Sequence, residues 1–104
     1  MWYVPGAVKR ADAIRVLFHC LPVLQSRFGV VQLELFGSVA RDEARPDSDV
    51  DVLVTFATTP SYTEFMELKA YLEDQLGTQV DLVTRKGLRA RVRPEVDREA
   101  IRVA

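Results

Sequence analysis

Apolar and polar positions along the chain follow two different periods. From Val8 to Phe28, and again from Tyr62 to Leu76, apolar side chains recur at steps of three and four residues, which predicts two amphipathic helices. Gly29 and Gly77 come directly after these patterns and are expected to end the helices. Pro22 lies inside the first pattern, where we expect it to kink or restart the helix, because an interior proline loses a backbone hydrogen bond.

Shorter runs rich in β-branched and aromatic residues predict three strands, Val30–Phe36, Asp49–Phe56 and Gln79–Thr84. Between the first two strands, Ser38–Glu43 is predicted to be one short helix and Ala44–Ser48, which holds Pro46, a turn. The segment Leu88–Val103 is predicted to be helical after Pro94, with Val96 and Ile101 as its apolar contacts.

The connections between the predicted strands constrain how the strands pair. The loop after the first strand must bring Gly37 and Ser38 beside Asp49, so the first two strands are most simply antiparallel neighbours. The fifteen-residue helix between the second and third strands has the length of a parallel crossover. The expected fold is therefore α/β, with a small mixed sheet of about three strands flanked by helices.

Length and composition predict one globular domain over residues 1–104, with no room for a separate substrate domain. The content of 48% hydrophobic and 28% charged residues is typical of soluble proteins. No apolar stretch approaches the roughly 20 residues that cross a bilayer, and the N-terminus lacks a signal-peptide pattern, so we expect no membrane partner. Cys20 is the single cysteine, which agrees with a reducing compartment, and we expect a cytoplasmic protein.

The net charge of −1 hides an asymmetry along the chain. Residues 1–84 carry seven basic and twelve acidic side chains, whereas residues 85–104 carry seven basic and three acidic ones. A basic end on an acidic body suggests an anionic partner or substrate near the C-terminus. A solvated helix face explains the same charges equally well.

Two aspartates one residue apart are the strongest chemical signal in the sequence. Strand alternation puts Asp49 and Asp51 on one face, and parallel pairing of the second and third strands places Asp81 beside them. Clustered carboxylates repel one another, and burying them without a cation would cost several kcal/mol. The pattern therefore favours a divalent metal, with Mg²⁺ the best fit, because it binds carboxylates, water and substrate phosphate.

A longer pattern surrounds these aspartates: Gly37-Ser38, ten further residues and then Asp49-x-Asp51, between two strand-like runs. It resembles the signature of the nucleotidyltransferase superfamily related to DNA polymerase β. The similarity is to its small single-domain branch, the minimal nucleotidyltransferases (MNT), whose motif reads Gly-Ser-x-Ala-Arg-Gly, a spacer and Ser-Asp-x-Asp. The matching residues are Gly37, Ser38, Ala40, Arg41, Ser48, Asp49 and Asp51. Asp42 replaces the final glycine of the first half, a change that would alter the tight turn there.

The resemblance implies a catalytic role for the three aspartates. In the family, residues at the positions of Asp49 and Asp51 hold the metal ions, of which two Mg²⁺ are expected here. Asp81 would complete the site on the side of the nucleophile, as a ligand of the second metal and as a candidate base. The reaction implied is transfer of AMP from ATP to a hydroxyl.

The resemblance also implies which residues bind the nucleotide. Gly37 and Ser38 would hold the β- and γ-phosphates through backbone amides and a hydroxyl. Ser48 matches the motif and is counted with the nucleotide-binding residues, and Arg41 would screen the leaving pyrophosphate, a task suited to a guanidinium. Other interpretations stay open for single residues: Gly37-Ser38 as a turn with a helix cap, or Arg41 in a surface ion pair with Glu43 or Asp47.

The family likeness points to a protein partner. Minimal nucleotidyltransferases commonly act as antitoxins beside an all-helical HEPN ribonuclease toxin, which they silence by transferring AMP to a tyrosine. Two alternatives remain: a non-catalytic antitoxin that neutralises such a toxin by binding alone, and nucleotide addition to RNA, for which the basic end is the only hint. The segments expected to dock the partner are rich in aromatic and arginine residues, namely Trp2 and Tyr3, and Arg89, Arg91 and Arg93.

Overall fold

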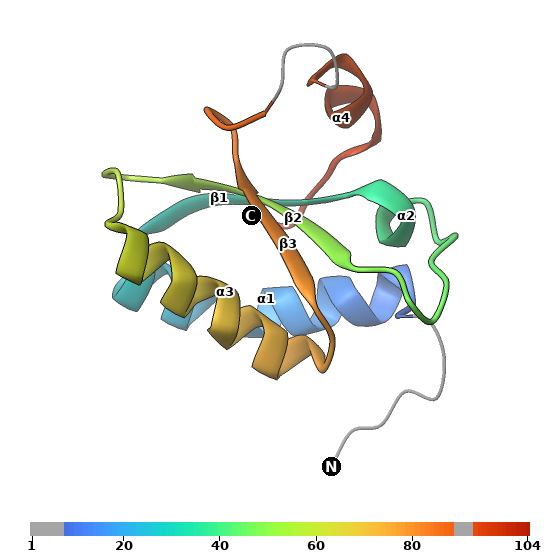
Figure 1. Cartoon of the computed structure of the whole chain (residues 1–104), viewed down its shortest axis with the longest axis horizontal. Helices are drawn as coiled ribbons and strands as arrows, with labels where there is room; N and C mark the ends of the chain where they lie inside the picture. Colours follow the sequence, from blue (N-terminus) through green and yellow to red (C-terminus); the bar gives the residue numbers. More distant parts are fainter. Residues whose placement is uncertain (1–7, 89–92) are drawn as a thin grey trace.

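One mixed sheet with helices on both faces organises the computed structural model, which describes residues 8–88 and 93–104 (Figure 1). The strand order is β3-β2-β1-β4, and helices α1 and α3 lie together on one face while α4 lies on the other. In chain order the elements are α1 (Arg10–Phe28), β1 (Val30–Phe36), α2 (Gly37–Ala40), β2 (Val50–Phe56), α3 (Tyr62–Leu76), β3 (Val80–Thr84), α4 (Arg93–Glu99) and β4 (Ile101–Arg102).

The pairing of the three long strands confirms the prediction from connection lengths. Strand β1 pairs antiparallel with β2, and β2 pairs parallel with β3 across the α3 crossover. The register sets Phe36 opposite Asp51 on one side and Asp51 opposite Asp81 on the other. The end of β1 and the starts of β2 and β3 therefore meet at one edge of the sheet.

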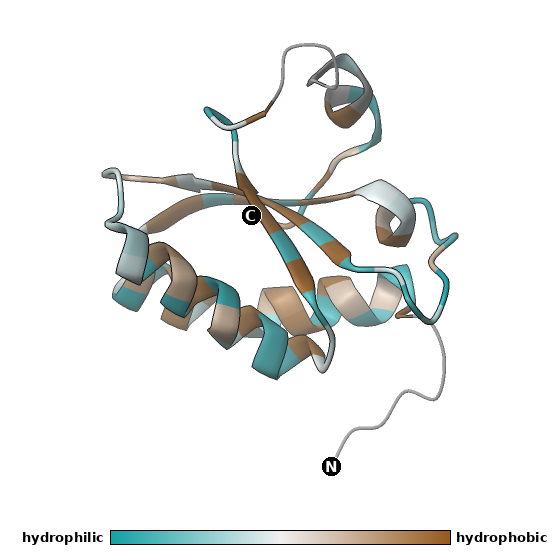
Figure 2. Ribbon diagram, viewed as in Figure 1, coloured by the Kyte–Doolittle hydropathy of each residue, from teal (hydrophilic) through white to brown (hydrophobic). Residues whose placement is uncertain are grey.

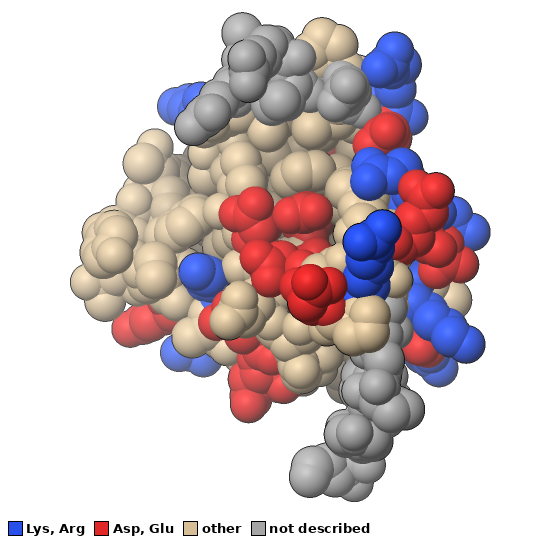
Figure 3. Space-filling model, turned by 45° about the vertical axis from the view of Figure 1, so that its right-hand side comes forward, with Lys and Arg blue, Asp and Glu red and all other residues tan. Residues whose placement is uncertain are grey.

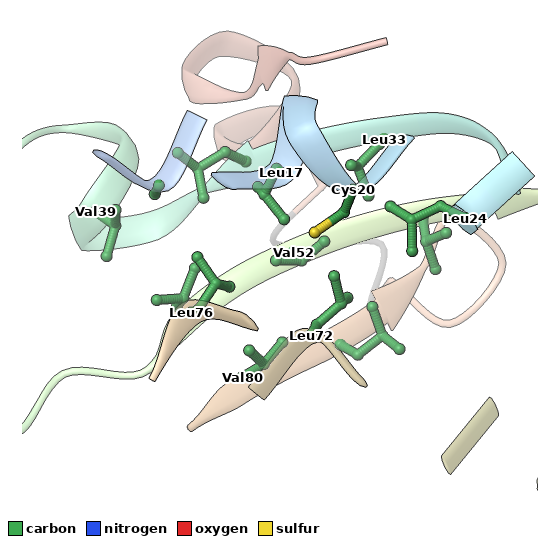
Figure 4. Close-up of a cluster of buried hydrophobic side chains, with 14 of the residues drawn as sticks. Leu17, Cys20, Leu24, Leu33, Val39, Val52, Leu72, Leu76 and Val80 are labelled. Atoms are coloured by element: carbon green, nitrogen blue, oxygen red, sulfur yellow. The ribbon is translucent and has the colours of Figure 1, made fainter. Parts of the chain in front are cut away.

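The main core lies between the sheet and the pair α1 and α3. Figure 2 shows hydrophobic residues, in brown, in both of these helices and in the strands. Figure 4 shows leucines of both helices directed toward β-branched side chains of the sheet. Apolar residues at helical spacing in α1 and α3, and apolar residues at alternate positions in the strands, therefore form one shared apolar layer. Its fully buried members include Leu17, Leu24, Leu33, Leu35, Val50, Val52, Val54, Leu68 and Leu72.

Helix α1 runs without a break through Pro22, so the predicted restart at this proline is wrong. Pro22 removes the hydrogen bond that the carbonyl of Phe18 would otherwise accept. Both residues lie on the exposed side of the helix, where water can satisfy that carbonyl. Gly29 and Gly77 end α1 and α3 in the left-handed conformation, as predicted.

The C-terminal segment differs from the prediction. Helix α4 ends at Glu99, and Ile101–Arg102 forms a fourth strand antiparallel to β1, so a helix reaching Val103 is wrong. Alternation explains the change, because Ile101 and Val103 pack on the main core while Arg102 between them is exposed. The backbone amide of Val103 also donates to the carbonyl of Leu33 at 2.8 Å.

A second, smaller apolar cluster lies on the face covered by α4. Leu53, Leu88 and Val96 are buried there, so the predicted apolar contact at Val96 is confirmed. Phe36 and Val83 pack against this cluster. Since Leu53 and Val83 follow Asp51 and Asp81 by two residues, the cluster lies next to these aspartates on the same face of the sheet. Over residues 8–88 and 93–104, no helix is both long and apolar enough to cross a membrane.

Candidate active site

Gly37 forms the exit from β1 and lies in direct contact with Asp51. Its φ of 75° is a left-handed value that favours glycine. A Cβ added at Gly37 would lie 2.9 Å from Cγ and 3.2 Å from Cβ of Asp51, and closer still to Oδ2. Any side chain at this position would therefore displace the Asp51 carboxylate.

Helix α2 is shorter than the predicted Ser38–Glu43 and ends at Ala40. The amide of Asp42 donates to the carbonyl of Val39 at 3.0 Å, and the amide of Glu43 donates to that of Ser38 at 2.9 Å. This pair of bonds is a Schellman motif, whose left-handed position is most often a glycine.

Asp42 occupies that left-handed position with a φ of 60°, so a tight turn forms here without a glycine. Aspartate is among the few residue types that adopt this conformation locally. That the turn differs from the one formed with glycine stays a prediction. Its Oδ1 also accepts a hydrogen bond of 3.0 Å from the amide of Arg10, at the N-terminus of α1. The preceding Lys9 offers no side-chain cap there, so Asp42 caps α1 from a distant loop.

The three predicted aspartates gather at the edge where the strands meet. The pKa of Asp51 is raised to about 6, first by burial, then by the charge of Asp81 and a side-chain hydrogen bond with it, and then by the charge of Asp49. The charge of Arg41 opposes this shift. Asp49 and Asp81 are exposed while Asp51 is partly buried, so the group forms an open rim around one inner carboxylate. Figure 3 shows a patch of acidic side chains on this side of the molecule, next to basic ones.

The donor set suits a hard divalent cation, since it consists of carboxylate oxygens whose negative charges raise the pKa of Asp51. Asp51 and Asp81 are close enough for a hydrogen bond, and Asp49 acts through its charge. Within the described ranges, no three His, Cys, Asp or Glu side chains are already arranged around one metal position. In the metal-free protein, a proton on one of the two carboxylates allows Asp51 and Asp81 to lie in contact. A bound cation would neutralise the carboxylates in place of that proton.

Arg41 makes the surface ion pair that sequence reasoning left open, and a second one that it missed. Its Nε donates to Glu43 Oε1 and its Nη1 donates to Glu99 Oε2, each at 2.9 Å. Glu99 is 58 positions away along the chain, so no local pattern indicated the contact.

Ser48 stabilises the turn that leads into β2. Its Oγ accepts from the amide of Arg45, and its own amide donates to the carbonyl of Arg45, both at 2.9 Å. These two bonds fix the chain one residue before Asp49.

A partly buried ion pair lies on the same face of the sheet as Asp51 and was also missed from the sequence. Glu34 is 7% exposed, and its two carboxylate oxygens accept from Arg85 Nη2 at 3.1 and 3.0 Å. Arg85 therefore links β3 to β1 across β2. The alternation of Glu34 with Leu33 and Leu35 could have indicated that its side chain lies on the face away from the main core.

The predicted docking residues Trp2, Tyr3, Arg89 and Arg91 lie outside the described residues, and so does the side chain of Arg93. Their role stays a prediction.

Residues 19–103 match the family model described as a nucleotidyltransferase domain. Over 80 residues the chain is 48% identical to the protein adenylyltransferase MntA of Thermococcus cleftensis, which covers 77% of this chain and 81% of the relative. A solved structure assigned as a minimal nucleotidyltransferase superposes with a TM-score of 0.75 at 41% identity, covering 90% of this chain and 95% of the other.

A chain from the complex of a tri-AMPylated Shewanella oneidensis HEPN toxin with its MNT antitoxin shares the fold, with a TM-score of 0.67 at 20% identity over 91% of this chain and 71% of the other. With the strand, turn and carboxylates described above, these matches define the protein as a nucleotidyltransferase. More narrowly, the chain belongs to the minimal nucleotidyltransferase family, and the predicted α/β fold class is confirmed.

Proposed function

We propose that this protein is an Mg²⁺-dependent adenylyltransferase that moves AMP from ATP to a tyrosine hydroxyl of a HEPN ribonuclease toxin, and so acts as an antitoxin. The observation that carries the proposal is the contact of Gly37 with Asp51, which lies opposite Asp81 in the ladder. The turn proposed to bind phosphate and the carboxylates proposed to bind metal are therefore adjacent. A module that only binds its partner has no use for this arrangement.

In this proposal the aspartates would hold two metal ions. Asp49 and Asp51 would be ligands on the side of the nucleotide, and Asp81 would be a ligand on the side of the acceptor. Bound Mg²⁺ would neutralise the carboxylates and polarise the α-phosphate. Asp81 is exposed, so an incoming hydroxyl can reach it from solvent.

The remaining roles follow the family motif. Gly37 and Ser38 bind the β- and γ-phosphates, and Ser48 holds the entry to β2. The acceptor oxygen forms a bond to the α-phosphorus while the bond from that phosphorus to the bridging oxygen of the β-phosphate breaks. The proton of the hydroxyl passes to Asp81, and pyrophosphate leaves beside Arg41.

The partner is proposed from relatives. The adenylyltransferase of Thermococcus cleftensis is close enough in sequence to suggest a protein substrate. The structures of toxin–antitoxin complexes share the fold at about a fifth identity, and they suggest a HEPN toxin as the acceptor. Nucleotide addition to RNA remains the weaker alternative, since the basic end of the chain is its only support.

Mass spectrometry tests the transfer directly. The protein is incubated with the product of the neighbouring gene, ATP and Mg²⁺, and a HEPN partner should gain about 329 Da for each AMP transferred. The double variant Asp49→Asn, Asp51→Asn should transfer none while staying folded. Silencing of an unmodified toxin by this inactive variant would instead support neutralisation by binding alone. Labelling of added RNA in place of the partner would support the second alternative.

A further inference from the structure

Arg41 is held beside the carboxylate site by two acidic side chains. Its Nε donates to Glu43 and its Nη1 donates to Glu99, each at 2.9 Å. In the parts of the chain that the structure describes, its third nitrogen, Nη2, makes no hydrogen bond. Arg41 also acts electrostatically on Asp51, so its guanidinium is close enough to affect an anion bound there.

The two acidic partners reach Arg41 from different parts of the fold. Glu43 lies two residues further along the same loop and has 67% of its side chain exposed. Glu99 is the last residue of α4, on the face of the sheet opposite α1 and α3, and has 37% of its side chain exposed. Both carry the same charge at the same distance from Arg41, but Glu99 alone joins Arg41 to another element.

Glu99 is itself fixed by packing on both sides. Three residues before it, Val96 is buried in the second apolar cluster against Leu53. Two residues after it, Ile101 begins β4 and pairs with Leu35 of β1. The position of the Glu99 backbone is therefore set by the sheet and not by the loop that carries Arg41.

We propose that Glu99 is a positioning residue for nucleotide binding: from α4 it holds the Arg41 guanidinium at the rim of the site, ready for the β- and γ-phosphates. The inference rests on the proposed function, since it takes ATP as the ligand of this site. Nη2 is the nitrogen left to meet phosphate. The assignment extends the site to α4, an element that the sequence motif does not include.

The physical basis is the ordering of a long side chain. An unrestrained arginine loses rotamer freedom when it binds a ligand, and this loss weakens binding. An ion pair to a fixed element removes part of the loss before the nucleotide arrives. The opposing effect is repulsion between a carboxylate and the triphosphate, which Glu43 exerts as well. Comparing Glu99 with Glu43 therefore separates positioning from simple charge.

The test is calorimetric titration of ATP and of AMP, each with Mg²⁺, into the wild-type protein and the variants Glu99→Ala, Glu99→Gln and Glu43→Ala. Glu99→Ala should weaken ATP binding about two- to fivefold, the effect of one exposed ion pair. AMP binding should be unchanged, since AMP lacks the phosphates that Arg41 meets. Glu43→Ala should bind ATP at least as tightly as the wild type, and Glu99→Gln should fall between Glu99→Ala and the wild type. In the transfer assay, Glu99→Ala should raise KM for ATP and leave kcat unchanged.

Three results would overturn the inference while leaving the proposed function intact. The first is that Glu99→Ala binds ATP as tightly as the wild type, or more tightly. Glu99 would then act only by repelling the triphosphate. The second is an equal loss of ATP and AMP affinity, which would indicate general damage to the fold. The third is that Glu99→Ala weakens ATP binding as much in an Arg41→Ala background as in the wild type. Positioning acts through Arg41, so without Arg41 the substitution of Glu99 should have no effect on ATP affinity. A wild-type protein that binds no ATP would overturn both proposals.

Discussion

Substituting Gly37 by alanine perturbs the backbone and the carboxylate site at once, and the chain offers a control that separates the two effects. A side chain in the left-handed region costs about 1–2 kcal/mol. Gly29 has a φ of 66° and no atom within 4 Å of an added Cβ, so Gly29→Ala carries this backbone cost alone. Gly29 precedes β1 and Gly37 follows it, so the control lies at the opposite end of the strand.

At Gly37 a second cost is added. The new Cβ would lie 2.9 Å from Cγ of Asp51, so the carboxylate must move out of its position. Overpacking of this kind costs about 1–3 kcal/mol. Gly37→Ala should therefore lower the free energy of unfolding by about 2–5 kcal/mol and Gly29→Ala by about 1–2 kcal/mol. Gly37→Ala should also lose ATP affinity, whereas Gly29→Ala should keep it.

Urea denaturation of the metal-free protein measures the two free energies of unfolding, and a third variant identifies the source of the difference. In an Asp51→Gly background, where both the carboxylate and the Cβ of Asp51 are absent, the cost of Gly37→Ala should fall to that of Gly29→Ala. The reasoning is refuted if Gly37→Ala and Gly29→Ala cost the same in the wild-type background. It is equally refuted if the excess cost at Gly37 persists without the Asp51 carboxylate.

Three further predictions concern stability. Because the pKa of Asp51 is raised to about 6 from 3.8, the metal-free fold holds a proton more tightly than the unfolded chain and loses stability as pH rises through 6. In EDTA at pH 7.5, Asp51→Asn should therefore be more stable than the wild type by about 1–3 kcal/mol. Thermal unfolding should show this difference vanish near pH 4. Arg85→Met leaves the buried carboxylate of Glu34 without this ion pair and should cost about 1–3 kcal/mol in urea denaturation, below the cost for a fully buried pair because the Arg85 side chain is 33% exposed. The double variant Glu34→Leu, Arg85→Met should cost clearly less, and equal costs would argue against the ion pair. Asp42→Ala loses the cap on α1 and adds backbone strain that aspartate avoids in part, so it should cost about 1–3 kcal/mol. Asp42→Gly also loses the cap but relieves the strain, so it should be nearly neutral, and the reverse order of melting temperatures would contradict this account.

The parts of the site that the sequence predicted depend on short-range rules. Alternation along one strand placed Asp49 and Asp51 on the same face, and the length of α3 implied the parallel pairing that brings Asp81 opposite Asp51. Both rules use residues that are near one another in the chain or joined by a single helix. The predicted placement of these aspartates therefore needed no knowledge of the rest of the fold.

The features that were missed depend on contacts between distant segments. The ion pair of Arg41 with Glu99 requires α4 to fold back over the sheet. The strand at Ile101 forms because the edge of β1 is available for pairing, although the sequence after Pro94 is also compatible with a helix. Helix α1 continues through Pro22 because this residue lies on the exposed side of the helix. Which side of α1 faces solvent depends on how the helix packs on the sheet, and this packing was not known from the sequence.

The ladder position of Asp81 also limits how the length of this chain can vary. Since side chains alternate between the two faces of a strand, removing one residue from the turn between Gly77 and Val80 would put Asp81 among the leucines of α3 or shift it along the ladder from Asp51. Changes in the loop before Ser48 face a looser limit, because the segment between α2 and β2 is longer and can absorb a change in length before β2 begins. Insertions and deletions among homologues should therefore accumulate before Ser48 and be rare between α3 and β3.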